Sequence, residues 1–333
     1  MASGRVVMER FESRALAGNA PGDPAVRVVP VYLPPSYDSA SDRRFPVVYV
    51  LTGFTGRGRM LLNDNLWSPP LDQRMDALIA AGCGEMIAVM PDCATRYGGS
   101  QYLDSSATGR YETHLVTELV PWIDGRYRTL AAREHRGIMG KSSGGYGALV
   151  QGMRHPDVFG ALACHSGDMY FEYCYRGDIP KFVTRVQNAD GLEKWFAGFE
   201  SARQKKHEDL TALNILAMAA AYSPNPAAPT FGIDLPCDLV SGAFRPEVWE
   251  RWLALDPLGM VDRHAEALRS LRLLYLDCGT RDEFHLQHGL RLFRGRLEAL
   301  GIRHHAQEFD DGHMNVPYRY DVSLPLLARA LGA

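Results

Sequence analysis

One glycine-rich turn limits what this chain can fold into more than any other feature. The segment GKSSGGYG at 140–147 follows a predicted strand, His135–Met139, and precedes an amphipathic pattern, Gly145–Arg154. Glycines stand two residues before and two residues after Ser142, which is the G-x-S-x-G arrangement of a nucleophilic serine on a sharp turn. Side chains at those positions would collide, and the N-terminus of the following helix favours negative charge beside the serine. Ser142 is therefore the candidate nucleophile.

Two other interpretations of this turn stay open. Ser143 is an alternative nucleophile, although Lys141 rather than glycine stands two residues before it. The segment could also be an ordinary glycine-rich loop between a strand and a helix. The combination of strand, turn and helix favours the first interpretation.

Short apolar runs alternate with amphipathic patterns along most of the chain. The predicted strands are Arg5–Ser13, Val26–Leu33, Pro46–Leu51, Met86–Met90, His135–Met139, Leu162–His165, Leu271–Leu276 and His305–Phe309. The predicted helices are Leu71–Ala81, Tyr111–Ile123, Gly145–Arg154, His288–Leu300 and Val322–Leu331. Continuous apolar strands alternating with helices are typical of a sheet covered on both faces. We therefore expect an α/β fold with a doubly wound, mostly parallel sheet, in a single domain over residues 1–333.

The stretch from 168 to 265 breaks this alternation. It is rich in aromatic residues and contains a charged patch, Arg203–Asp209, and a proline-rich turn, Ser223–Pro229. We expect a mainly helical, lid-like insertion after the sixth strand. It would lie over the carboxyl ends of the strands, where ligands bind in open α/β sheets.

Composition and charge narrow the class of protein. The 333 residues are 46% hydrophobic and carry a formal net charge of −3, so we expect neither nucleic acid nor a membrane as partner. The beginning of the chain has no secretory signal pattern, and the six cysteines form no CxxC pair. These features favour a cytoplasmic protein with reduced thiols and no cofactor. A homo-oligomer is compatible with the sequence. Asp282, His285 and His288 suggest a metal site only weakly, and we expect none.

A serine hydroxyl needs a base within hydrogen-bond reach, and with this motif the chain order is serine, acid, histidine. The late histidines are His285, His288, His304, His305 and His313. The first two open a helix, and the next two enter the last strand at its far end. His313 follows that strand in a polar loop, from which it can reach the turn at Ser142. It is the predicted base.

The acid is expected in the turn after Leu271–Leu276. This turn reads DCGTRDE at 277–283 and offers three carboxylates, those of Asp277, Asp282 and Glu283. Asp277 could instead cap the strand end, and Glu283 could be a solvated charge at a helix N-terminus. The residues alone leave these three open.

Four segments together resemble a known family. They are PVVYVLTGFTG at 46–56, GKSSGGYGA at 140–148, CGTRDEF at 278–284 and DDGH at 310–313. They are similar to the putative-esterase branch of the α/β-hydrolase superfamily, which includes esterase D-type S-formylglutathione hydrolases, feruloyl esterases, enterochelin esterases and mycolyltransferases. The resemblance implies an α/β-hydrolase fold and a Ser-Asp-His triad. Its Gly-x-x-Asp pattern selects Asp282 as the acid, and its late Gly-His position matches His313.

An oxyanion hole requires two preorganised N–H donors. One is expected from the backbone of Ser143, the residue after the nucleophile. The resemblance implies the backbone of Phe54 as the second. Many family members carry His-Gly after the third strand, whereas this chain has Thr52-Gly53.

Four aromatic residues are candidates for substrate contact. Tyr97, Tyr102 and Tyr111 lie in the segment 92–112 after a predicted strand, where a binding loop and a purely structural loop are equally reasonable. Trp67 could line an acyl pocket or anchor its loop by packing.

These observations predict a serine carboxylic ester hydrolase. It would act on a small-molecule ester through an acyl-enzyme, with Ser142, His313 and Asp282 as nucleophile, base and acid. An acyltransferase with the same triad is the first alternative. A non-catalytic binding protein on the same scaffold is the second.

Overall fold

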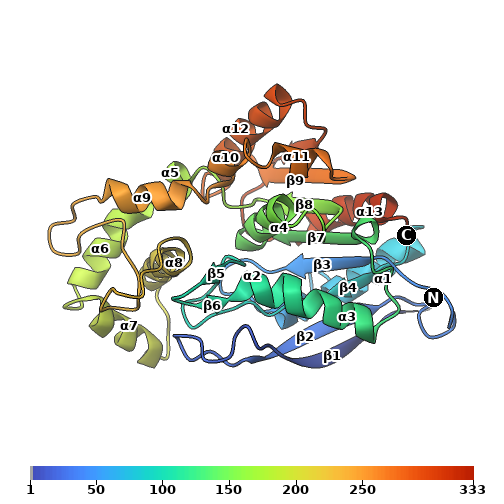
Figure 1. Ribbon diagram of the computed structural model, residues 1–333, viewed down its shortest axis with the longest axis horizontal. Coiled ribbons are helices and arrows are strands. Elements are labelled where there is room, and N and C mark those ends of the chain that lie inside the picture. Colours follow the sequence, from blue (N-terminus) through green and yellow to red (C-terminus); the bar gives the residue numbers. More distant parts are fainter. Residues whose placement is uncertain (1–2) are drawn as a thin grey trace.

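The protein is built around an eight-stranded sheet, seen in a computed structural model that describes residues 3–333 (Figure 1). The strand order is β1-β2-β4-β3-β7-β8-β9-β10. These strands are β1 (Arg5–Glu12), β2 (Val26–Leu33), β3 (Val47–Leu51), β4 (Ile87–Val89), β7 (Arg136–Lys141), β8 (Ala161–His165), β9 (Leu273–Gly279) and β10 (His305–Phe309). β2 runs antiparallel to β1 and β4, and all the other neighbours are parallel. The predicted mostly parallel sheet is confirmed.

Helices cover both faces of this sheet. The helices outside the insertion are α1 (Leu71–Ala80), α2 (Tyr111–Thr113), α3 (Val120–Arg126), α4 (Ser143–Arg154), α12 (Leu286–Ala299) and α13 (Tyr320–Leu331). Short 3-10 turns are η1 (Gly58–Leu62), η3 (Arg133–His135) and η5 (Pro317–Arg319), and a π-helical turn, η2 (His114–Leu119), joins α2 to α3. α1 and α13 pack on one face, while α3, α4 and α12 pack on the other. The doubly wound arrangement is therefore confirmed.

The alternation of side chains along β3 shows how the sheet separates two cores. Tyr49 and Leu51 point into the core that contains α4, whereas Val48 and Val50 point into the core under α1 and α13. All are fully buried. A strand buried on both faces reads as a continuous apolar run, which explains the sequence PVVYVL.

The segment between β8 and β9 is mainly helical. It contains α5 (Phe171–Cys174), η4 (Arg176–Asp178), α6 (Ile179–Gln187), α7 (Leu192–Ser201), α8 (His207–Tyr222), α9 (Pro246–Leu253), α10 (Pro257–Met260) and α11 (Ala265–Arg269). Figure 1 places α6–α9 on the left, beyond the hairpin of β5 (Asp104–Ser105) and β6 (Gly109–Arg110).

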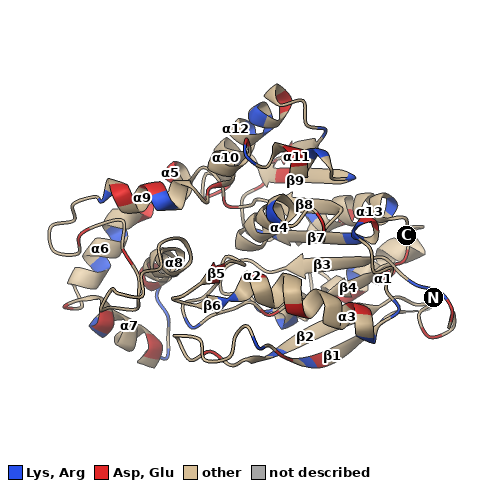
Figure 2. Cartoon of the chain, viewed as in Figure 1, with Lys and Arg blue, Asp and Glu red and all other residues tan. Residues whose placement is uncertain are grey.

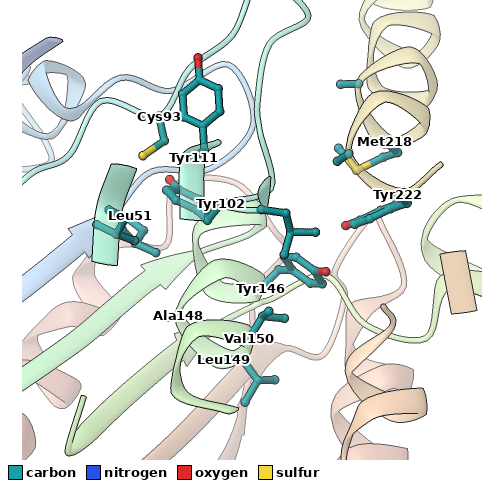
Figure 3. Close-up of a cluster of buried hydrophobic side chains, with 14 of the residues drawn as sticks. Leu51, Cys93, Tyr102, Tyr111, Tyr146, Ala148, Leu149, Val150, Met218 and Tyr222 are labelled. Carbon is teal, nitrogen blue, oxygen red and sulfur yellow. The ribbon is translucent and has the colours of Figure 1, made fainter. Parts of the chain in front are cut away.

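Aromatic packing joins this segment to the sheet domain. Tyr146 on α4 and Tyr222 on α8 face each other with ring centroids 5.8 Å apart (Figure 3). Tyr222 in turn packs on Phe171 and Trp252. One buried apolar cluster therefore runs from the strands into the helical segment. That the segment moves as a lid stays a prediction.

Within residues 3–333, neither like-charged nor apolar residues form long uninterrupted runs. Acidic and basic residues are interspersed along the visible elements (Figure 2). Within residues 3–333, no helix combines the length and the apolar character that a membrane span requires. All six cysteines are free thiols.

Candidate active site

Ser142 sits at a strained turn between β7 and α4. Its backbone has φ 58° and ψ −129°, a conformation that costs free energy for a residue with a side chain. Its N–H donates to the carbonyl oxygen of His165, at the end of the neighbouring strand β8, over 2.9 Å. The turn therefore lifts Ser142 off the end of β7 and fixes its backbone to β8.

The two flanking glycines are required by space. A Cβ on Gly140 would lie 2.4 Å from the carbonyl oxygen of Gly144, and a Cβ on Gly144 would lie 2.4 Å from that of Leu51. Backbone atoms cannot swing away as the end of a side chain can. The collision expected from the sequence is thus present on both sides of Ser142.

A substitution at Gly144 should therefore destabilise the protein strongly. We expect Gly144→Ala to lower the free energy of unfolding by about 3 kcal/mol, because the new methyl group overpacks against the backbone of β3. Gly295→Ala is the matched control, since Gly295 is an exposed position in α12 where a Cβ meets nothing within 4 Å. That change should stabilise the helix by about 0.5–1 kcal/mol. Urea unfolding of both variants measures the difference, and equal stabilities would contradict this account of the turn.

The structure brings the predicted nucleophile, base and acid together. His313 Nε2 lies 3.0 Å from Ser142 Oγ, and His313 Nδ1 lies 2.7 Å from Asp282 Oδ2. Asp282 comes from the loop after β9 and His313 from the loop after β10. Asp282 and His313 are only 2% and 3% exposed. The three side chains thus form a hydrogen-bonded line, in which Asp282 and His313 are shielded from water.

Neighbouring groups hold the acid and the base in place. Asp282 Oδ1 accepts the backbone N–H of Phe284 over 2.9 Å, and the Phe284 ring packs edge-on to the His313 ring. The backbone N–H of His313 donates to Glu283 Oε2 over 2.6 Å. Glu283, considered at first as a solvated charge or an alternative acid, therefore braces the histidine loop. Its position next to Asp282 gave no sign of this contact.

Asp277, the other alternative acid, is hydrogen-bonded to a second histidine, His165. Its Oδ1 lies 2.7 Å from His165 Nδ1, and its Oδ2 accepts from Arg319 and Tyr275. Burial alone would raise the pKa of Asp277, but the charges and hydrogen bonds of His165 and Arg319 hold it below its ordinary value. His165 Nε2 lies 2.9 Å from Ser323 Oγ on α13. The chain therefore contains a second Ser–His–Asp line, and Ser323 is completely buried.

The predicted oxyanion donors lie on the two sides of Ser142. Within residues 3–333, neither the Phe54 N–H nor the Ser143 N–H has a protein hydrogen-bond acceptor. A Cβ on Gly53, the residue before Phe54, would lie 3.7 Å from Ser142 Oγ, so this loop passes beside the nucleophile. Two free N–H groups next to the serine are what an oxyanion hole requires.

Tyr102 braces the loop that carries Phe54. Its hydroxyl donates to the carbonyl oxygen of Thr52 over 2.6 Å, and its ring is buried against Leu51 (Figure 3). Thr52 stands where many family members carry histidine, and a tyrosine hydroxyl holds the loop backbone here. Tyr102, predicted as a substrate contact, thus has a bracing contact that the sequence did not reveal.

The other aromatic candidates lie elsewhere. Trp67 is 89% exposed, so it does not line a closed pocket in this conformation. Tyr97 is buried against Phe196 and Phe231. Tyr111 is fully buried, with its hydroxyl accepting from Arg27 and donating to a backbone carbonyl. Among the described residues none of these three rings contacts the triad, and substrate contact by them stays a prediction.

The structure does not bring Asp282, His285 and His288 together as a group of metal ligands. The rings of His285 and His288 lie 6.5 Å apart, and the Asp282 carboxylate is committed to His313. Across residues 3–333 no group of three His, Cys, Asp or Glu side chains gathers as a metal site would need.

Comparisons with known proteins found a matching family and several relatives. The profile of the family described as "Putative esterase" matches residues 25–321. The esterase Rv1288 of Mycobacterium tuberculosis is 31% identical over 165 residues, which are 47% of this chain and 31% of that protein. An endo-1,4-β-xylanase/feruloyl esterase of Xylanibacter ruminicola is 30% identical over 187 residues, 52% of this chain and 24% of that protein. The chain thus spans about a third or less of these two relatives' length.

Solved structures share the fold over the whole chain. A ferulic acid esterase superposes with a TM-score of 0.64 at 22% identity, covering 99% of this chain and 100% of that one. An S-formylglutathione hydrolase from Agrobacterium tumefaciens superposes with a TM-score of 0.59 at 18% identity, covering 100% and 97%. The α/β-hydrolase fold expected from the sequence is therefore confirmed.

Proposed function

Because this chain belongs to the putative-esterase family, we propose that it hydrolyses carboxylic esters of small molecules through an acyl-enzyme on Ser142. The observation that carries the proposal is the position of His313, which reaches Ser142 with one ring nitrogen and Asp282 with the other. An imidazole held in this way can take a proton from the serine and later return it.

The first half of the reaction forms the acyl-enzyme. With its own proton on Nδ1, held by Asp282, His313 accepts the Ser142 hydroxyl proton at Nε2 while Oγ bonds to the ester carbonyl carbon. The negative charge on the former carbonyl oxygen is stabilised by the N–H groups of Phe54 and Ser143. The bond to the leaving alcohol then breaks, and His313 gives the proton to the departing oxygen.

The second half releases the acid. A water molecule loses a proton to His313 Nε2 as its oxygen attacks the acyl carbon, and the same two N–H groups stabilise the charge that develops. The bond to Ser142 Oγ breaks, and the proton returns to the serine. Asp282 stays ionised throughout and stabilises the transient imidazolium.

A fluorophosphonate probe followed by peptide mass spectrometry tests the proposal. We expect the label on the peptide that contains Ser142 and none on Ser323, which also lies beside a histidine but has no exposed surface. A parallel assay uses p-nitrophenyl esters of increasing acyl length, with and without an added alcohol as acceptor. Label on another residue, or no label together with no turnover, would overturn the proposal. Acyl transfer to the alcohol that outpaces hydrolysis would replace it with the acyltransferase alternative.

A further inference from the structure

A second buried carboxylate lies beside the proposed catalytic residues. Asp168 follows the end of β8 by three residues and is 5% exposed. Its Oδ2 atom accepts three hydrogen bonds: from Ser143 Oγ at 3.0 Å, Gln101 Nε2 at 3.0 Å and Tyr175 OH at 2.8 Å. Ser143 is the first residue of α4, directly after the nucleophile. Asp168 is therefore one side chain away from a proposed oxyanion donor.

The Asp168 carboxylate has an unusual electrostatic environment. Among residues 3–333 no lysine, arginine or histidine lies within 4.0 Å of it, although burying an unpaired charge costs free energy. Burial raises the pKa of Asp168, and the three donors and the nearby His313 oppose that rise. The Asp168 charge also acts electrostatically on Lys141 and His313. The remaining titratable groups around it are acidic or neutral: Tyr146, Cys164, Cys174, Tyr175 and Tyr222, with Asp282 and Glu283 beside His313.

The surroundings of Ser143 leave it little freedom. A cavity of only about 10 Å³, room for roughly one water, lies between Phe54, Gln101 and Ser143. Gln101 also donates to Tyr222 OH over 2.9 Å, which links the network to α8 of the helical segment (Figure 3 shows Tyr222). The Asp168–Ser143 bond is thus part of a packed network.

We propose that Asp168 is a positioning residue for ester hydrolysis, which fixes Ser143 beside the proposed nucleophile. The inference rests on the proposed function. Holding the Ser143 hydroxyl fixes the first residue of α4, and with it the direction of the N–H that receives the oxyanion. Such a donor must stay within a few tenths of an ångström of its working position to be effective.

Asp168→Asn separates this effect from general stability. The amide keeps the shape of the side chain but replaces the charge-assisted bond from Ser143 with a weaker, neutral one. We expect kcat to fall about 10-fold, part of the roughly 10²–10³ that a whole oxyanion donor contributes, with KM within about twofold.

Two further variants identify the route of the effect. Ser143→Ala should lower kcat to a similar extent, because it removes the hydroxyl that Asp168 holds. Because both changes act on the same contact, the double variant should be little slower than Asp168→Asn alone. Tyr175→Phe removes a different donor to Asp168 and leaves the Ser143 bond in place, so its kcat should fall less than that of Asp168→Asn.

Asp256→Asn is the matched control. Asp256 is another buried carboxylate, 2% exposed, and accepts the backbone N–H groups of Tyr170, Phe171 and Leu258. Its variant should lose stability and keep the wild-type kcat per folded molecule. Asp168 would be merely structural if its variant lost activity only in proportion to folded protein, or added its full effect to that of Ser143→Ala. If Asp168→Asn does not fold, Ser143→Ala decides, and a wild-type kcat in that variant would overturn the proposal. Absence of turnover and of Ser142 label in the wild type would instead contradict the proposed function itself.

Discussion

Replacing Ser142 with alanine is expected to lower kcat for any ester substrate by about 10⁴–10⁶-fold, as removal of a triad nucleophile does. The fold should survive, because the Ser142 backbone bond to His165 and the flanking glycines remain. Substrate binding should also survive, so a slowly hydrolysed ester should bind the variant with nearly unchanged affinity. Steady-state kinetics, isothermal titration and thermal unfolding measure the three quantities.

Ser323→Ala is the control for this prediction. Ser323 is hydrogen-bonded to His165 as Ser142 is to His313, but it is fully buried. We expect Ser323→Ala to keep the wild-type kcat and to lose about 1–3 kcal/mol of stability, because a buried histidine nitrogen is left without its partner. If Ser142→Ala kept more than a hundredth of the activity while Ser323→Ala lost it, the proposed nucleophile would be wrong, and Ser323 with His165 would be the reactive pair.

Asp282→Asn is expected to lower kcat by about 10³–10⁴-fold with little change in KM. The carboxylate accepts a hydrogen bond from His313 Nδ1–H, whereas an amide can turn its NH₂ group toward the ring and favour the other tautomer. His313 would then present a proton rather than a lone pair to Ser142. The ground-state contacts with substrate stay as they are, which is why the loss should appear in kcat.

Asp310→Asn provides the surface control in the same region. The Asp310 side chain is 83% exposed in the loop that carries His313, and within residues 3–333 its one ion pair is with Arg281. Its variant should match the wild type in kcat within about twofold, since exposed ion pairs contribute little. Retention of a tenth or more of the activity by Asp282→Asn would remove Asp282 from the proposed mechanism.

Ser142 and His313 could be chosen from local chemistry in the sequence, whereas the resemblance to the putative esterases selected Asp282 from three carboxylates in one turn. The turn at Ser142 needs glycines at two fixed positions, and the strands before Asp282 and His313 end at the same edge of a parallel sheet. Chain order then settles their roles. A pattern of this kind predicts where the backbone lies. Because the loops after β9 and β10 are short, the backbone position also determines where the Asp282 and His313 side chains lie.

Other features depend on contacts that local patterns do not record. The hydroxyl of Tyr102 meets Thr52 across 50 residues of chain, and Gln101 meets Asp168 across 67. Neither partner stands in a distinctive motif, so no local pattern indicates that they pair. The helix expected over Tyr111–Ile123 is instead α2, a π-helical turn and α3. Pro121, which has no N–H to continue the hydrogen-bond ladder, stands in the first turn of α3.

The second Ser–His–Asp line has a consequence for how such enzymes are recognised. Its two key distances, 2.9 Å and 2.7 Å, are almost those of the line at Ser142, 3.0 Å and 2.7 Å. A geometric template of atoms and distances would therefore retrieve two catalytic centres from one chain. Their surroundings separate them, because Ser323 is fully buried whereas Ser142 is partly exposed beside the N–H groups of Phe54 and Ser143. Reactivity in this protein is thus a property of the surroundings of a serine as much as of the residues bonded to it.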